Sequence, residues 1–190
     1  MNIYFATQNQ GKIEEANQVL APLGYEVVGV QVPMVEPDTG TVEEIARTKL
    51  QQAMKHGYER IMVDDAGIYF TAYPQFPGVL SKRIFHRLGY RGLEKLLKDE
   101  SREAWFEGAV SVYWDGHIQT FMGRTYGHLI EPLTSIQDEN HSFPYDPAFI
   151  PQGDTRVLQQ MSLEEKLVYS YRRRALEKMA KWLKKEMIQN

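Results

Sequence analysis

Three polar side chains in a turn near the N-terminus have the types and spacing to bind a phosphate group. They are Thr7, Asn9 and Lys12, and with Gly11 they follow a predicted strand at 3–6 and precede a predicted helix. Backbone amides and the dipole at a helix N-terminus favour an anion, and Lys12 adds a full positive charge. The Walker phosphate-binding pattern is absent. An ordinary turn with a solvated lysine is the alternative, and the turn alone does not decide between the two.

Lys49 falls on the apolar stripe of a predicted helix. The apolar positions of that helix recur at helical spacing and are Val42, Ile45, Ala46, Leu50 and Ala53. A buried ammonium group without a partner is costly. The side chain therefore either extends along its stem to solvent or meets an anion, and the periodicity leaves both open.

Asp64 and Asp65 directly follow an apolar strand at 61–63, and Ala66-Gly67 predicts a turn after them. Neighbouring residues in a strand face opposite ways, so we expect only one of the two carboxylates in a given site. Open α/β sheets bind ligands at the carboxyl ends of their strands, and Mg²⁺ needs only one or two protein carboxylates when phosphates complete its coordination. Further acidic residues upstream offer oxygen ligands: Glu36, Asp38, Glu43 and Glu44. A turn-forming acidic pair is the alternative.

Two later segments suit the recognition of a base. Arg172 lies on the buried stripe of the last predicted helix, where a guanidinium suits an acceptor such as a nucleobase carbonyl. Lys166 and Tyr171 are close in sequence. Phe143 and Asp146 combine a ring that can stack a base with an acceptor for a ring N–H. A solvated basic helix start and simple loop packing are the alternatives.

Composition excludes several classes of protein. The chain has 190 residues, 22 Lys and Arg against 25 Asp and Glu, and no Cys. Disulfides, a thiol nucleophile and cysteine-based metal sites are therefore excluded, and the net charge of −3 argues against nucleic acid as a partner. No apolar run approaches the length of about 18 residues that a membrane span needs, and the N-terminus lacks a basic leader. We expect one soluble, cytoplasmic domain over residues 1–190 that does not bind membranes.

The order of elements predicts an α/β or α+β domain with a mixed sheet. Predicted strands lie at 3–6, 25–32, 61–63, 107–114, 118–125 and 127–130, with a hairpin turn at Asp115-Gly116. Predicted helices follow residue 12, cover 42–53 and 88–99, begin at a capping box of Ser162 with Glu165, and run from Ser170 to about Lys185. We expect loops at 73–81 and 135–154.

Five parts of the chain, in this order, resemble the Ham1-like inosine triphosphate pyrophosphatase family. They are ATQNQGK at 6–12, TGTVEEIARTK at 39–49, VDDAGI at 63–68 with FPGVLSKR at 76–83, SFPYDPAFIP at 142–151 and EEKLVYSYRRRAL at 164–176. The resemblance implies an elongated mixed sheet with helices in two lobes around a cleft, and a homodimer. It also implies magnesium-dependent hydrolysis of nucleoside triphosphates, usually those of inosine and xanthosine, to monophosphate and pyrophosphate.

The resemblance also implies roles for individual residues. Asp65 would bind Mg²⁺ and activate water. Phosphates would be held by Thr7, Asn9, Lys12 and Lys49, and the base and the rest of the nucleotide by Phe143, Asp146, Lys166, Tyr171 and Arg172. With Lys12, Lys49, Lys166 and Arg172 converging on one triphosphate, we expect a local cationic pocket inside an acidic chain.

Departures from the family pattern concern the metal and the base. The family's metal-binding glutamate falls on Pro37, so we expect Glu36 or Asp38 to replace it. Pro144 replaces a glycine of the family pattern and so removes an N–H beside the base. Tyr171 replaces a histidine, and Ala66 replaces a serine or threonine. The hypothesis is a pyrophosphatase whose base preference has moved or broadened. A catalytically silent nucleotide-binding member and a nucleic-acid-binding module are the alternatives.

Overall fold

The computed structural model describes residues 1–137 and 143–189, and contacts divide the chain into two compact units. The first unit is built from Met1–Ala66, Gly108–Gly123 and Tyr171–Asn190. The second unit is built from Gly67–Glu107 and Arg124–Ser170. The expectation of one domain over 1–190 stays a prediction.

Within the described residues, a mixed sheet of seven strands supplies the framework of the fold. Its strands are β1 (Asn2–Phe5), β2 (Glu26–Gly29), β3 (Arg60–Phe70), β4 (Pro77–Gly78), β5 (Glu103–Trp114), β6 (His117–Leu129) and β7 (Phe149–Pro151). The order is β2-β1-β3-β5-β6-β7, and β4 pairs with β3. β1 is parallel to β2 and β3, whereas β4 and β7 are antiparallel to β3 and β6. The predicted fold class, a mixed sheet with flanking helices, is confirmed.

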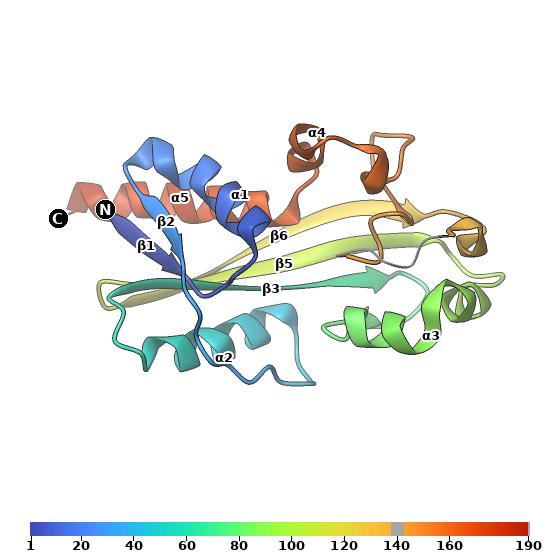
Figure 1. Ribbon diagram of the computed structural model, residues 1–190, viewed down its shortest axis with the longest axis horizontal. Coiled ribbons are helices and arrows are strands. Elements are labelled where there is room, and N and C mark those ends of the chain that lie inside the picture. Colours follow the sequence, from blue (N-terminus) through green and yellow to red (C-terminus); the bar gives the residue numbers. More distant parts are fainter. Residues whose placement is uncertain (138–142, 190) are drawn as a thin grey trace. The chain divides into compact units, whose positions relative to one another are not determined.

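Helices cover both faces of the sheet in the first unit. They are α1 (Gln10–Leu20), followed by the 3₁₀ turn η1 (Ala21–Leu23), α2 (Val42–Met54) and α5 (Tyr171–Gln189). In Figure 1, α1 and α5 lie together on one side of β1 and β3, and α2 lies on the other side. Asn9 caps α1 by accepting a hydrogen bond from the Lys12 amide, and Thr41 with Glu44 forms a capping box on α2.

Alternation along β3 decides which helix each of its side chains meets. Met62 packs into the core beneath α1 and α5, while Ile61 and Val63 pack into the core beneath α2. Because side chains in a strand alternate between faces, Asp64 faces α1 and α5, and Asp65 faces α2. Two adjacent carboxylates therefore enter two different environments.

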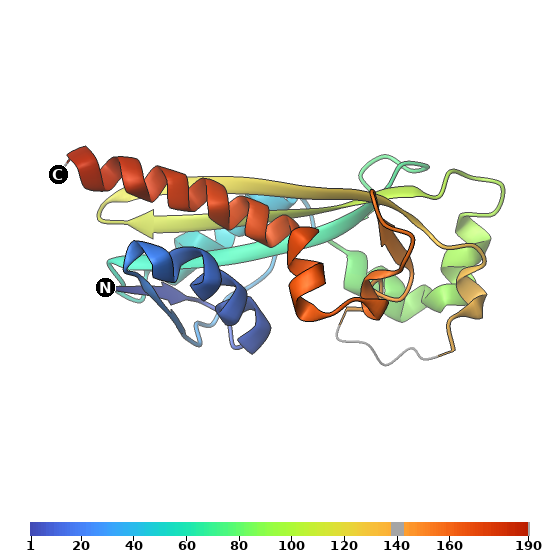
Figure 2. The same cartoon turned by 90° about the horizontal axis from the view of Figure 1, so that it is seen from above.

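The second unit packs short elements around aromatic side chains. These elements are α3 (Ser81–Leu96), η2 (Leu133–Ser135), η3 (Leu158–Gln160) and α4 (Leu163–Val168), and Figure 2 shows η2 beside α3. Buried Tyr145 donates a hydrogen bond to the Ser81 carbonyl oxygen over 3.0 Å. Tyr90 donates to the Pro144 carbonyl oxygen over 2.6 Å. These bonds fix the segment that carries Phe143.

Several expected boundaries are wrong, most importantly the turn at Ala66-Gly67. β3 continues to Phe70 because β4 lies directly against it: a Cβ atom at Gly67 would lie 2.2 Å from the Gly78 carbonyl oxygen. This glycine permits close approach of two strands and makes no turn. The helix expected at 88–99 covers Ser81–Leu96. It consists of two helical pieces joined by a kink at Gly89, which has a φ of 59°, and only the second piece was expected.

The remaining differences concern strand limits. The strand expected at 25–32 covers only Glu26–Gly29, and the strand expected at 127–130 is the end of β6. The loops expected at 73–81 and 135–154 contain β4 and β7, two short strands without an alternating pattern long enough to detect. The hairpin at Asp115-Gly116 and the capping box of Ser162 with Glu165 are confirmed. Residues 138–142 of the expected loop lie outside the described residues.

Candidate active site

Asp64 joins two cationic side chains on the face of β3 that meets α1 and α5. Its Oδ1 lies 2.9 Å from Lys12 Nζ, and its Oδ2 lies 2.8 Å from Arg172 Nε. Arg172 Nη1 lies 2.9 Å from Glu15 Oε2. We call Lys12, Glu15, Asp64 and Arg172 the Asp64 cluster.

Electrostatics in the Asp64 cluster favour the ionised carboxylate. Burial disfavours the charge, but Lys12 and Arg172 outweigh it and hold the pKa of Asp64 well below its usual range. Burial lowers the pKa of Lys12, and the positive charge of Arg172 lowers it further, against the attraction of Asp64. Arg172 was expected on the inward stripe of the last helix, and its bonds to Glu15 and Asp64 confirm that position.

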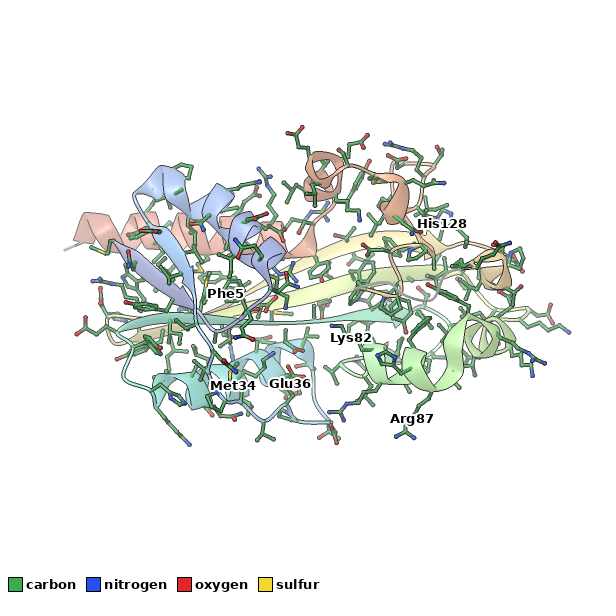
Figure 3. All side chains as sticks on the ribbon, viewed as in Figure 1. Phe5, Met34, Glu36, Lys82, Arg87 and His128 are labelled. Atoms are coloured by element: carbon green, nitrogen blue, oxygen red, sulfur yellow. The ribbon has the colours of Figure 1, made fainter. Side chains whose placement is uncertain are left out.

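Lys49 lies on the opposite face of β3, between oxygen atoms from two parts of the chain. Its Nζ donates to Glu36 Oε1 over 2.8 Å, to the Asp64 carbonyl oxygen over 2.9 Å and to Asp65 Oδ1 over 3.4 Å. Figure 3 shows Glu36 beside α2, on the other side of β3 from Phe5. We call Glu36, Lys49 and Asp65 the Asp65 cluster. The structure thus decides the alternative left open for Lys49: its ammonium group is buried and meets anions.

The pKa values in the Asp65 cluster depend on burial and on neighbouring charges. Burial raises the pKa of Asp65 to about 6, with Lys49 lowering it and the negative charge of Glu36 raising it further. Burial lowers the pKa of Lys49, but Asp65 and Glu36 outweigh this effect and raise it overall. A carboxylate that is costly to ionise gains from any cation placed beside it.

The two clusters together hold three cationic side chains and four carboxylates. Lys12, Lys49 and Arg172 each already face an internal carboxylate, and their expected convergence on one triphosphate stays a prediction. Composition could not reveal this pairing, since residues far apart in the sequence supply it. A metal cation bound here would make the local charge more positive and so favour the binding of a polyphosphate.

Thr7, Asn9 and Tyr171 all belong to the first unit. Thr7 Oγ1 accepts a hydrogen bond from the Asn9 amide over 3.2 Å, so both side chains shape the turn that leads into α1. The Tyr171 ring packs on Gly108, where a Cβ atom would lie 2.4 Å from it. The Arg172 guanidinium lies 5.4 Å from the centre of the same ring. Tyr171 therefore supports the position of Arg172.

The residues predicted to frame the base lie in the second unit. Lys166 Nζ is 3.2 Å from Asp146 Oδ2, and each side chain is about one-third exposed, at 32% and 29%. The Phe143 ring is 5.4 Å from the Phe106 ring and 5.9 Å from the Tyr145 ring. Asp146 and Lys166 therefore meet each other, and Phe143 extends an aromatic group of the core. Ser142, in the segment that resembles the family, lies outside the described residues.

Asp64 and Glu15 were not among the expected site residues. The sequence predicts that one carboxylate of the Asp64-Asp65 pair enters a site while the other caps the turn or pairs with a cation, and Asp64 pairs with two cations. Glu15 was not singled out. A usable signal existed for Glu15, because it follows Lys12 by three residues and so shares its side of α1. For Asp64 the signal was indirect: Lys12 and Arg172 are inward-facing cations, and each needs an anionic partner.

The donor set around Lys49 fits a divalent metal ion. A positive group there is bound by two carboxylates and one backbone carbonyl, which are the hard oxygen ligands that Mg²⁺ prefers. Over residues 1–137 and 143–189 no group of three or more His, Asp or Glu side chains could hold a metal ion. One or two carboxylates are enough for Mg²⁺, so Glu36 and Asp65 could supply two of its ligands, with water and phosphate oxygens supplying the others.

Glu36 and Asp38 can be separated by substitution. Glu36 shares the Lys49 ammonium group with Asp65, and Asp38 follows Glu36 by two residues in the same loop. We expect Glu36→Gln to weaken Mg²⁺ binding about tenfold or more, because one carboxylate ligand is lost, and Asp38→Asn to change it less than about threefold. Calorimetric titration of both variants with Mg²⁺ would check this, and the reverse order would assign the metal to Asp38.

The fold and these residues define a mixed α/β protein that brings acidic and cationic side chains together around one strand of its sheet. The chain belongs to the Ham1 family, whose model matches residues 3–182. It is 38% identical to a dITP/XTP pyrophosphatase of Thermococcus kodakarensis, over 98% of this chain and 100% of the relative. It is 34% identical to an inosine triphosphate pyrophosphatase of Yarrowia lipolytica, over 96% of each chain.

Solved structures agree with this assignment. A HAM1 protein from Coxiella burnetii superposes with a TM-score of 0.82 at 24% identity, covering 97% of this chain and 99% of that one, and shows the fold. A dITP/XTP pyrophosphatase from Mycobacterium abscessus superposes with a TM-score of 0.68 at 29% identity, covering 88% and 93%. The resemblance seen in the sequence is confirmed. Among the described helices, none combines the length and the apolar character needed to cross a membrane.

Proposed function

We propose that the chain is a nucleoside triphosphate pyrophosphatase that uses Mg²⁺ and acts on purine nucleotides of the inosine and xanthosine type. The observation that carries the proposal is the Asp64-Asp65 pair, which places one carboxylate beside Lys12 and Arg172 and the other beside Lys49 and Glu36. The names of the relatives, dITP/XTP pyrophosphatase and inosine triphosphate pyrophosphatase, support the reaction and the substrate class.

The reaction needs positioning and neutralisation of charge more than covalent chemistry. Water adds to the α-phosphorus, the bond between the α-phosphorus and the oxygen that bridges it to the β-phosphorus breaks, and pyrophosphate leaves. Asp65 would accept the proton of that water, while Lys12 and Lys49 would hold the phosphates near the turn of Thr7 and Asn9. Bound Mg²⁺ supplies positive charge and makes a coordinated water more acidic.

The base would be framed by residues of the second unit. Phe143 offers a ring for stacking, Asp146 an acceptor for a ring N–H, and Lys166 a donor for a ring carbonyl. Two departures from the family pattern bear on selectivity. Pro144 has no N–H to donate, and a phenol ring in Tyr171 replaces an imidazole. We therefore propose a base preference that is shifted or broadened relative to the family.

A substrate screen tests both the reaction and the selectivity. With Mg²⁺ and a panel of ribo- and deoxyribonucleoside triphosphates, we expect pyrophosphate and monophosphate as products. Because one donor beside the base is missing, we expect at least one nucleotide outside the inosine and xanthosine pair to react within about tenfold of the best substrate. Release of single phosphate ions would overturn the proposed reaction. A strong preference for inosine triphosphate over all others would overturn the altered selectivity.

We further propose that the protein is a cytoplasmic homodimer. Family membership supports the dimer, and the nucleotide substrate supports the compartment. Light scattering of the purified protein would give the oligomeric state, with a mass near twice 22.0 kDa as the expected result.

A further inference from the structure

The Lys49 ammonium group occupies the position where a metal ion would meet Glu36 and Asp65. It is only 10% exposed, and its three oxygen partners come from the loop before α2 and from β3. The group is shared by two carboxylates and a backbone carbonyl, which are the hard oxygen ligands that a divalent cation prefers.

We propose that Lys49 is an exchangeable counter-ion: it holds Glu36 and Asp65 together while no metal is bound, and it gives up these carboxylates when a divalent cation binds. The displaced ammonium group then takes the substrate phosphates as its new partner. This second step rests on the proposed function. The first step concerns only the protein and a metal ion.

Charge and reach favour this exchange. An ammonium group and a divalent cation repel each other strongly at bonding distance from the same oxygens, so the two cannot share the pair. Lysine carries its charge on a flexible four-carbon stem, which lets the charge move while the helix stays in place. The site also holds more carboxylates than cations, so a released lysine leaves enough negative charge for the metal.

The alternative is a permanent ion pair. In that case Lys49 would keep Glu36 and Asp65 in every state, and the metal would bind with other ligands. The two ideas differ in what a metal ion does to nucleotide-free protein, and this can be measured without turnover.

The test is Mn²⁺ binding to the nucleotide-free protein, followed by the electron paramagnetic resonance of free Mn²⁺. We expect one equivalent in the wild type and one in Lys49→Met, with an affinity at least about tenfold higher in Lys49→Met because its competitor is gone. Lys49→Arg keeps the charge and should stay within about threefold of the wild type. Lys55→Met, an exposed lysine at the end of the same helix, should not change the affinity.

Several results would overturn the proposal. These are an unchanged or lower affinity in Lys49→Met, a second equivalent that appears only in that variant, and an equal gain in Lys49→Arg. If Lys49→Met does not fold without metal, the ¹⁵N resonance of the Lys49 ammonium group in the wild type is followed instead. This resonance is assigned by its loss in Lys49→Arg. Mg²⁺ alone must shift that resonance, and an unmoved signal at saturating Mg²⁺ would overturn the exchange.

Failure of the exchange and failure of the proposed function are distinguishable. Normal release of pyrophosphate by the wild type, together with an unchanged Mn²⁺ affinity in Lys49→Met, would overturn only the exchange. The expected Mn²⁺ affinities in a protein that hydrolyses no nucleoside triphosphate would overturn only the proposed function.

Discussion

Replacement of Asp65 by asparagine is expected to lower the rate of pyrophosphate release by about 10³-fold or more, while nucleotide binding survives. The substitution keeps the shape of the side chain but removes both its metal-binding charge and its basicity. The cations proposed to hold the substrate remain in place. Steady-state kinetics with Mg²⁺ and inosine triphosphate would measure the loss, and binding of a non-hydrolysable analogue would measure what is retained.

The Asp65 variant also separates the enzyme from a catalytically silent member of the family. Near-normal turnover in Asp65→Asn would remove this carboxylate from the mechanism. A wild-type protein that binds nucleotides without releasing pyrophosphate would instead support the silent alternative. Asp115→Asn, at the distant hairpin turn, is the control for unspecific effects, because Asp115 pairs with Arg60 at an exposed position.

Local signals in the sequence were sufficient to place α1, α2, α4 and α5 and the inward cations Lys49 and Arg172, but not the start of α3. Lys49 and Arg172 interrupt apolar stripes, and a charged residue in such a place needs a partner whatever the topology is. The capping box predicted for α4 is equally local, because a hydroxyl and a glutamate three residues apart satisfy the same amides in any fold. The same kind of box on α2 was not predicted.

Partners that meet across the sheet were beyond the reach of local patterns. β3 continues through Asp64 and Asp65 because β4 and β5 pair with it, and no signal inside 61–67 shows that pairing. A glycine that closely follows two acidic residues is typical of a turn. Gly67 instead lies within β3, where the absence of a side chain lets Gly78 of β4 approach closely. The role of Asp64 as a shared anion for α1 and α5 depends on the same long-range arrangement.

The acidic residue chosen beside Pro37 illustrates the same limit. The sequence reduced the choice to Glu36 and Asp38, which differ in chain position by two. Only the fold shows that Glu36 and Asp65 meet at one ammonium group. The assignment of the metal to Glu36 remains a prediction for the binding experiment described above.

Replacement of Asp64 by asparagine is expected to destabilise the protein by about 3–5 kcal/mol, because two cations on buried helix faces lose their shared anion. Asp64 is 5% exposed, and Lys12 and Arg172 both bond to it. Asparagine has the same shape but offers one amide in place of a charge. Urea unfolding at neutral pH would give the free energy of unfolding of each variant. Asp115→Asn, which weakens an exposed pair, should cost no more than about 1 kcal/mol.

The same carboxylate predicts how stability depends on acid. The pKa of Asp64 is depressed in the folded protein, so its contribution is fully present above the ordinary aspartate pKa of about 4 and is lost as pH falls below that value. Between about pH 5 and pH 3 the wild type should therefore lose more free energy of unfolding than Asp64→Asn, which has no proton to take up. Equal acid sensitivity of the two proteins, or equal destabilisation by Asp64→Asn and Asp115→Asn, would show that Asp64 is not the anion that holds α1 and α5 to the sheet.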